Sequence, residues 1–421
     1  MDWTEIVDPG RVAGGRSLSS ASTASGTLIP TPASSETGGV NPSPARAPMP
    51  AVAPAGPLLV TTLSPTSWRP QYPRIGQFAV TPSREVVAAG PNGLISFTQI
   101  LDHPSRPWSE PRPFPPTTAR LDASTVTGLT VHREQGTGGI LHVCCVADGV
   151  LHAFSRSEDP GSSFVVDPSP PFAGSRVSGT PAVARIETRY DDRNWCIVAP
   201  CQSGGMLFTL TDSSQGGFSY GPPKQGWEPA SQVAGQIGIV SAVSVAVTRN
   251  GKRRIFGGYS DSTFRSIVAV CIASGRLHSV EGPLERPSMY RKSSWQDPKA
   301  TRVQHLGEVT GNPVLLRNYK DGMDGNVDLL VPSAEGGVFH FVRTPTSPDE
   351  WHMIGRIKFP RGVPIASSLA CARLNSNYGQ PIICAYVQCG GRLYLIKTPE
   401  GPCPWVGCQL YPIEGPGPFL H

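Results

Sequence analysis

The sequence predicts an all-β fold, and within that class a β-propeller of six or seven four-stranded blades. Three observations lead to this prediction. A glycine followed by a short apolar strand recurs along the chain, the recurrences are 37 to 70 residues apart, and the 421 residues include 46 Gly and 45 Pro. Dense Gly and Pro suit many brief strands joined by tight turns. Repeats of about 50 residues with four short strands each are typical of β-propellers.

The recurring element is seen in "GGVFHFVRTPTSPDEW" at residues 336–351. We expect its glycine to lie in the turn between the second and third strands of a blade, where a positive φ is needed. An aromatic residue follows 12 to 22 residues later, and we expect it on the outer strand, packed against a neighbouring blade. The glycines are Gly56, Gly93, Gly149, Gly205, Gly275, Gly337 and Gly391. The aromatic residues are Trp68, Trp108, Phe164, Trp227, Trp295, Trp351 and Trp405.

Apolar runs upstream of the glycines supply the other strands. The second strands are expected at "EVVAAG", "ILHVCCVA", "WCIVAP", "SIVAVCIA", "VDLLVP" and "IICAYV". First strands are expected at "FAVT", "TPAVARIE", "SAVSVAVT", "NPVLLR" and "SSLACARL". The Gly56 unit has only its last two strands. Two arrangements therefore remain open: a seventh blade closed by N- and C-terminal pieces, or a six-bladed ring with an N-terminal extension.

The N-terminal region differs in composition from the repeats. Residues 1–55 consist mainly of Ser, Thr, Ala, Pro and Gly with almost no large apolar residues, so this segment cannot bury enough surface to offset the entropy of ordering. We expect residues 1–55 to be a low-complexity disordered tail. Residues 56–421 are expected to form a single β-propeller domain.

Charge and hydropathy exclude several classes of protein. The net charge of +5 is spread thinly rather than gathered into a basic stripe, so we expect no nucleic-acid partner. The longest apolar runs fall short of the roughly 20 residues that cross a bilayer, and the start of the chain has no apolar signal-peptide core. We expect a cytoplasmic protein without a membrane span. The sequence does not indicate an oligomeric state.

The ten cysteines do not form a metal-binding pattern. Five of them, Cys144, Cys145, Cys196, Cys271 and Cys384, lie in strand-like runs, where free Cys behaves as a small apolar residue. The Cys-x4-Cys pairs lack the spacing of a zinc site. Fitting a calcium loop to "DGMDGNVD" (Asp321–Asp328) puts Lys320 and Gly322 where oxygen ligands are needed. We expect core packing and no metal, although Cys403 and Cys408 could pair in an exported protein.

The motif of Gly, an apolar pair, His and a Pro/Ser turn before Trp resembles the repeats of seven-bladed propeller lectins related to the fucose-binding lectins of fungi and soil bacteria. The best local match is "GNVDLLVPSAEGGVFHFVRTPTSPDEW", and the likeness extends over residues 58–412. In such lectins near-identical blades repeat one sugar site at each blade interface. Here the fourth motif position varies, so the repeats do not predict identical sites. It is His152, His278 and His340 in three units and Leu59, Ser96, Phe208 and Tyr394 in others.

Two groups of residues are candidates for a ligand site. His152, His278, His340 and Trp351 recur at equivalent repeat positions, where they either hydrogen-bond and stack on a ligand or serve as structural residues. The second group lies in two long insertions of the Gly275 unit, since long loops in a compact repeat are often functional. These insertions carry candidate ligand-binding residues Arg253, Arg254, Tyr259 and Arg265 and candidate catalytic residues Tyr290, Arg291 and His305.

Three hypotheses for function follow. The first is a lectin-like propeller that binds a carbohydrate or other small molecule. The second is a cofactor-independent cyclase or pericyclase of fungal-type specialised metabolism, for example a hetero-Diels-Alderase, since divergent blades can build one asymmetric pocket. The third is a scaffold for protein partners. The sequence has no motif of a hydrolase, an oxidoreductase or a nucleotide-binding protein, so we expect no cofactor and leave enzyme activity open.

Overall fold

The computed structural model describes the propeller region in segments. The described residues are 59–62, 76–81, 84–98, 109, 112–133, 140–157, 162–167, 170–186, 194–210, 227, 229–249, 265–283, 301–303, 307–317, 326–344, 347–359, 361–375, 381–397 and 409–412. The predicted tail at residues 1–55 lies outside them. No helix in these segments is long and apolar enough to span a membrane.

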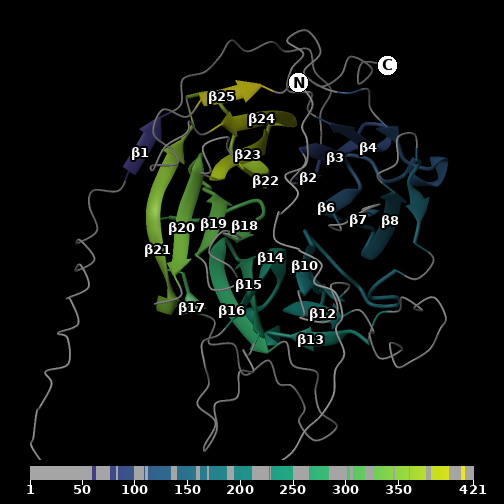
Figure 1. The fold of residues 1–421 in the computed structure, drawn as a ribbon, viewed down its shortest axis with the longest axis horizontal. Helices are drawn as coiled ribbons and strands as arrows, with labels where there is room; N and C mark the ends of the chain where they lie inside the picture. Colours follow the sequence, from purple (N-terminus) through teal and green to yellow (C-terminus); the bar gives the residue numbers. More distant parts are fainter. Residues whose placement is uncertain are drawn as a thin grey trace, which may run out of the picture. The chain divides into compact units, whose positions relative to one another are not determined.

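The described strands form six antiparallel sheets, which we number as blades 1 to 6 in chain order (Figure 1). Blade 1 contains β2 (Phe78–Val80), β3 (Glu85–Gly90), β4 (Gly93–Thr98) and β5 (Arg112–Pro113). Blade 2 contains β6 (Val126–Arg133), β7 (Ile140–Ala147), β8 (Val150–Ser157) and β9 (Val165–Val166). Blade 3 contains β10 (Ala182–Ile186), β11 (Asn194–Pro200), β12 (Met206–Leu210) and β13 (Ser231–Val233). Blade 4 contains β14 (Val240–Arg249), β15 (Arg265–Ala273), β16 (Arg276–Pro283) and β17 (Thr301–Arg302). Blade 5 contains β18 (Val314–Arg317), β19 (Val327–Pro332), β20 (Val338–Thr344) and β21 (Ser347–Lys358). Blade 6 contains β22 (Ala366–Asn375), β23 (Pro381–Cys389), β24 (Arg392–Lys397) and β25 (Gln409–Pro412).

The sheets form a closed ring. Contacts between first strands run from β2 to β6, β10, β14, β18 and β22 and return to β2. Six hydrophobic clusters match this order, since each contains residues of two consecutive blades. The cluster that joins blade 6 to blade 1 includes Phe78, Phe97 and Tyr386. A propeller fold with six blades is therefore confirmed in the described residues.

The blades pack on both faces because their second strands are largely apolar. In β15, Ile267 and Ala269 belong to the cluster shared with blade 3, while Val268 and Val270 belong to the cluster shared with blade 5. Successive side chains of a strand point to opposite faces. A continuous apolar run therefore identifies a strand that is buried on both sides.

The fifth strand of blade 5 explains the incomplete Gly56 unit. β1 (Leu59–Thr62) pairs in parallel with Gly355–Lys358 of β21, on the outer edge of that sheet. The described part of the unit is thus a strand added to an existing blade and not part of a seventh. The resemblance to seven-bladed lectins is corrected in blade number, and the ring with an N-terminal extension is the arrangement found.

Glycine turns lie between the second and third strands, as predicted. Gly336 and Gly337 have φ of 91° and 92°, and in blade 2 the pair Asp148 and Gly149 has φ of 51° and 79°. In blade 5 the two glycines follow a turn that is closed by the bond from Gly336 N to Ser333 O. In blade 2 Asp148 and Gly149 are the two central residues of the loop, since Ala147 pairs with Val150, and consecutive positive φ values at these positions are typical of a type I′ hairpin turn. Such a turn matches the twist of the strands that it joins.

The outer strands depart from the prediction. Trp351 lies in β21, but Phe164 and Trp227 precede β9 and β13 instead of lying within them. The remaining predicted outer-strand tryptophans, Trp68, Trp108, Trp295 and Trp405, lie outside the described residues. Trp351 packs against the cluster between blades 4 and 5.

The predicted strand cysteines are free, and all five are buried, as are Cys201 and Cys389. Burial raises the pKa of the Cys144, Cys196 and Cys389 thiols to about 12. These thiols therefore stay protonated and act as small apolar residues. Cys403 and Cys408 lie outside the described residues.

Blades 2, 4 and 6 share a local feature of their first strands. A β-bulge inserts one extra residue near the start of the strand, namely Thr127 in β6, Ser241 in β14 and Ser367 in β22. Each of these hydroxyls donates a hydrogen bond to a carbonyl of the adjacent second strand. The three bulges alternate with blades whose first strands have no such irregularity.

Candidate functional site

Two cavities lie at one end of the blades. Within each blade the first strand begins where the second strand ends, because the two are antiparallel; Val240 at the start of β14, for example, pairs with Ala273 at the end of β15. The turn that leads into the third strand therefore lies at this same end. Both cavities are lined by residues of these turns and strand starts.

The first, which we call the inter-blade cavity, has a volume of about 460 Å³. Its wall contains Leu207, which belongs to the hydrophobic cluster between blades 2 and 3. The described lining residues are Ser175, Arg176, Cys201, Gln202, Ser203, Leu207 and Gln232. A volume of this size falls in the usual range for small-molecule pockets.

Backbone and side-chain bonds fix the positions of its polar groups. Gln202 donates a backbone hydrogen bond to the carbonyl of Arg176 at 3.3 Å, and its side-chain Nε2 donates to the carbonyl of Val177 at 3.2 Å. Gln232 Nε2 donates to the carbonyl of Gly204 at 2.8 Å. Arg176 is exposed and lines the same cavity as these two amides. The cavity thus combines hydrogen-bonding side chains with the apolar surface of Leu207.

Blade 5 contains the same framework with different side chains. The turns "PCQSGG" (200–205) and "PSAEGG" (332–337) make matching backbone bonds: Cys201 N to Gly205 O and Ser333 N to Gly337 O, both at 3.0 Å. In the strand register Gln232 lies opposite Leu207, and Arg356 lies opposite Phe339. Since Leu207 and Phe339 are each the second residue after the turn, Gln232 and Arg356 are equivalent. The equivalent pairs are Arg176 and Glu308, Gln202 and Ala334, Ser203 and Glu335, and Gln232 and Arg356.

In blade 5 the side chains of this framework bind one another. Arg356 forms an ion pair with Glu335 at 3.0 Å and donates to Ser333 Oγ at 3.2 Å. Its guanidinium also lies over the ring of Phe339, 5.1 Å from the centroid. The equivalent Gln232 in blade 3 instead donates from Nε2 to Gly204 O and Ser203 Oγ, and no ion pair forms there among the described residues. Repeated architecture has produced two chemically different sites.

The second, which we call the axial cavity, has a volume of about 380 Å³ and is lined by residues from all six blades or the segments that lead into them. Its polar side chains are Gln77, Thr127, Thr180, Ser241, Thr310 and Ser367. None of the described residues that line it is ionisable. It lies where the six first strands begin.

The three candidate histidines occupy equivalent positions in the third strands of blades 2, 4 and 5 but have different surroundings. His340 is buried, and its Nε2 lies 2.9 Å from Asp328 Oδ1 within the same blade. His152 and His278 are half-buried and lie opposite Cys145 and Cys271. None of the three lines the inter-blade or the axial cavity.

His152 supplies a test through its titration. Burial lowers the pKa of His152, and the nearby Asp148 carboxylate opposes this shift. The folded chain therefore binds the proton less readily than the unfolded chain, whose His titrates near about 6.5. The contribution of neutral His152 to stability is present above that pH and is lost as the pH falls below it.

We expect His152→Gln to reduce the loss of thermal stability between pH 7.5 and pH 5, measured as the difference in Tm. His352→Gln is the matched control, since it removes an exposed imidazole. Equal pH dependence of Tm in wild type and His152→Gln would show that folding does not change the pKa of His152.

Most residues of the predicted insertion site lie outside the described segments. Arg253, Arg254, Tyr259, Tyr290, Arg291 and His305 are among the residues not described. Arg265 is the first residue of β15 and pairs with Arg249 at the end of β14. That end of blade 4 is opposite to Ser241 and Gly275, which line the axial cavity. Arg265 is therefore distant along its strand from both cavities.

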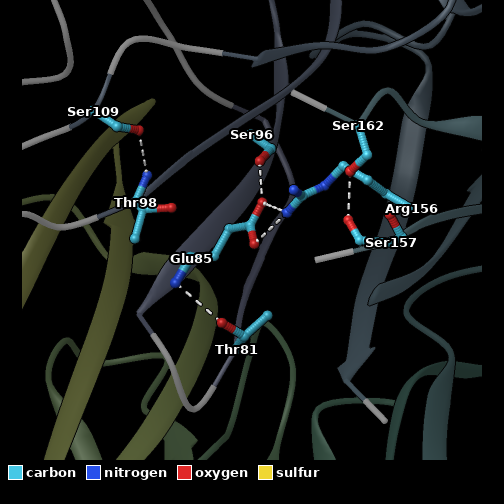
Figure 2. Close-up of polar contacts among 8 residues, drawn as sticks. All are labelled: Thr81, Glu85, Ser96, Thr98, Ser109, Arg156, Ser157 and Ser162. Carbon is cyan, nitrogen blue, oxygen red and sulfur yellow. Dashed lines mark hydrogen bonds and ion pairs between the residues drawn. The ribbon is translucent and has the colours of Figure 1, made fainter. Parts of the chain in front are cut away.

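A buried ion pair between blades 1 and 2 was not anticipated from the sequence (Figure 2). Arg156 Nη2 lies 2.7 Å from both carboxylate oxygens of Glu85, and Ser96 Oγ also donates to this carboxylate. The Arg156 guanidinium lies over the ring of Phe164, 5.1 Å from the centroid. Glu85 and Arg156 are 8% and 6% exposed, so solvent cannot replace either partner. This network joins two blades and faces neither cavity.

A potential nucleophile near the His340–Asp328 pair is not activated. Burial raises the pKa of the Cys371 thiol, and the Asp328 carboxylate raises it further. A catalytic cysteine needs the opposite shift, since the thiolate is the nucleophile. The described residues contain no group of three or more His, Cys, Asp or Glu side chains placed to hold a metal ion.

Comparison with known proteins gives a likeness in fold. No family model matches the sequence, and no curated protein matches it. Among solved structures, AofleA from Arthrobotrys oligospora superposes with a TM-score of 0.50 at 10% identity, over 82% of this chain and 87% of AofleA. A mutant of AofleA gives 0.51 with the same identity and coverage. The SapL1 lectin, solved in complex with alpha methyl fucoside, gives 0.46 at 11% identity over 82% of this chain and 97% of SapL1. The chain thus has a lectin-like β-propeller fold similar to that of AofleA, and the resemblance stated from the repeats is confirmed at this level.

Proposed function

We propose that this protein is a carbohydrate-binding propeller that holds one sugar residue of a glycan in the inter-blade cavity. The observation that carries the proposal is the arrangement of Arg176, Gln202 and Gln232 around the apolar surface of Leu207. The guanidinium offers several donors in fixed directions, and the amide oxygens offer acceptors, since Gln232 Nε2 already donates to Gly204 O and Ser203 Oγ. Ring hydroxyls can accept from the guanidinium and donate to the amide oxygens, while the C–H face of a sugar lies on an apolar side chain.

The proposal predicts a single site because the repeats differ. The blade 5 framework holds Glu308 and Ala334 in place of Arg176 and Gln202, and Arg356 is already paired with Glu335. A glycan at that position would have to break an existing ion pair. The protein therefore differs from a multivalent lectin with one identical site per interface.

The test is a glycan array that includes fucose-containing glycans, probed with wild-type protein and with single variants. We expect retention of at least one glycan class by the wild type. Arg176→Ala should lower affinity by about 10- to 100-fold, since a hydrogen bond to a charged group contributes about 1.5–3 kcal/mol. Gln202→Ala removes a neutral amide and should have a smaller effect of the same sign.

Glu308→Ala is the matched control because Glu308 occupies the position equivalent to Arg176 in blade 5. It should leave glycan retention unchanged. Thermal melting of each variant separates loss of binding from loss of fold. If the folded wild type retains no glycan above background, or if Arg176→Ala and Gln202→Ala bind as the wild type does, the proposal is wrong.

A further inference from the structure

The axial cavity contains a threefold set of hydroxyls. Thr127, Ser241 and Ser367 all line it, and each is the bulged residue of its first strand. They come from blades 2, 4 and 6 and so alternate around the ring with blades 1, 3 and 5. All three residues are exposed. The bulges therefore present equivalent oxygens from every second blade.

These oxygens can only accept hydrogen bonds from a ligand. Thr127 Oγ1 donates to the carbonyl of Val146 at 3.2 Å, and Ser241 Oγ and Ser367 Oγ make the equivalent bonds to second-strand carbonyls at 3.2 Å and 3.3 Å. A hydroxyl has one proton and two lone pairs. Because each proton is used in a bond to the backbone, the remaining lone pairs select a ligand that brings its own donors.

The side chains that line the cavity do not suit an anion or a divalent metal ion. An anion finds no cationic side chain among the described lining residues, and a carboxylate or a sulfate also has no proton to donate. A divalent cation prefers carboxylate oxygens at short distances, and none of the described lining residues provides one. The volume of about 380 Å³ is also far larger than a bare ion needs. A neutral polyhydroxyl group fits both the charge and the size.

Two exposed isoleucines lie next to this set. Ile239 and Ile365 are 70% and 50% exposed, and each stands two residues before a bulged serine, Ser241 and Ser367 respectively. Neither isoleucine lines the cavity itself, but large apolar side chains at equivalent exposed positions of two blades offer an apolar surface next to the bulged residues along the chain. This surface suits an apolar substituent on the polyhydroxyl group.

From these observations we infer that the axial cavity is a second binding site, separate from the inter-blade cavity, for a neutral polyhydroxyl compound that carries an apolar substituent. Its hydroxyls donate to Thr127, Ser241 and Ser367, and its apolar part lies against Ile239 and Ile365. The site does not depend on Arg176, so it stands or fails independently of the proposed glycan site.

The test uses n-octyl β-D-glucopyranoside below its micelle concentration and methyl β-D-glucopyranoside as probes, with binding followed by saturation-transfer NMR and titration calorimetry. The wild type should bind both, and the octyl compound more tightly. Combined Thr127→Val, Ser241→Ala and Ser367→Ala should weaken both by about tenfold or more, since three hydrogen bonds are lost. Combined Ile239→Ser and Ile365→Ser should weaken only the octyl compound.

The titrations are repeated in Arg176→Ala, which removes the proposed glycan site, so the binding that remains there is assigned to the axial cavity. Glu350→Ala serves as the control and should leave both affinities unchanged, since Glu350 is largely exposed and lines neither cavity. The substituted residues are exposed, and a thermal melt of each variant verifies folding. The inference is overturned if the wild type binds neither probe, if the hydroxyl variant binds both as the wild type does, or if calcium or phosphate displaces the glucosides. It is also overturned if the isoleucine variant retains full affinity for the octyl compound.

Discussion

Replacing Glu85 with Ala is expected to lower the free energy of unfolding by about 3–5 kcal/mol. The substitution leaves the Arg156 guanidinium buried without its carboxylate partner, and burial of an unpaired charge is strongly unfavourable. Ser96 loses its acceptor at the same time. Because Glu85 lies in blade 1 and Arg156 in blade 2, the loss weakens the contact between two blades. Urea unfolding followed by circular dichroism measures the change.

An exposed glutamate provides the matched control. Glu350 lies 3.8 Å from His352, and both side chains are largely exposed, so Glu350→Ala should change stability by less than about 0.5 kcal/mol. A double variant, Glu85→Leu with Arg156→Leu, removes both charges and should recover most of the stability lost in Glu85→Ala. A Glu85→Ala protein as stable as the wild type would show that the ion pair does not hold the blades together.

Replacing Gly179 with Ala is expected to destabilise the fold by about 3 kcal/mol. Gly179 has φ of 59°, and an added Cβ would lie 1.8 Å from the carbonyl oxygen of Ser241. That oxygen accepts the hydrogen bond from Thr180 N at 3.1 Å, and Val243 N donates to Thr180 O at 3.0 Å. The methyl group would force blades 3 and 4 apart where these bonds join them.

A substitution at Gly174 separates the steric contact of the added methyl group from the backbone strain at positive φ. It also has a positive φ, 79°, but an added Cβ there meets nothing within 4 Å. Gly174→Ala should therefore show only the backbone strain, about 1 kcal/mol. Thermal melting of the two variants beside the wild type gives the comparison. Equal destabilisation by both substitutions would exclude close approach of the blades as the cause.

The repeat pattern predicted most of the fold because blade strands are buried on both faces. Continuous apolar runs such as "EVVAAG" and "VDLLVP" coincide with β3 and β19. The turn glycines were found for a related reason, since only a few residue types tolerate the positive φ that the turns require. The residue types within each segment were therefore enough to predict these strands and turns.

The sequence was less informative where structure depends on distant partners. β6 was not among the predicted first strands, because Gly128 and polar residues interrupt its apolar pattern. Gly128 is needed there for packing, since an added Cβ would lie 2.1 Å from the carbonyl oxygen of Gly179. The number of blades was also undecided, because nothing local shows that β1 joins the edge of blade 5 instead of starting its own sheet.

The inter-blade cavity was missed because its residues are scattered. Arg176, Gln202 and Gln232 come from three separate segments of the chain, and only the fold brings them together. A usable signal was nevertheless present. Aligning "PCQSGG" with "PSAEGG" shows that the turn positions Gln202 and Ser203 differ from Ala334 and Glu335 within an otherwise shared frame. Differences of this kind between repeats are where an asymmetric site is expected.

The measurement that tests the proposed glycan site most directly is the stoichiometry of glycan binding. Titration calorimetry with the glycan best retained on the array should give one glycan bound per chain in wild-type protein and in Glu308→Ala. The same titration should give strongly reduced binding in Arg176→Ala. Several equivalent glycans per chain, or one glycan bound with unchanged affinity by Arg176→Ala, would contradict a single site built from the side chains of the inter-blade cavity.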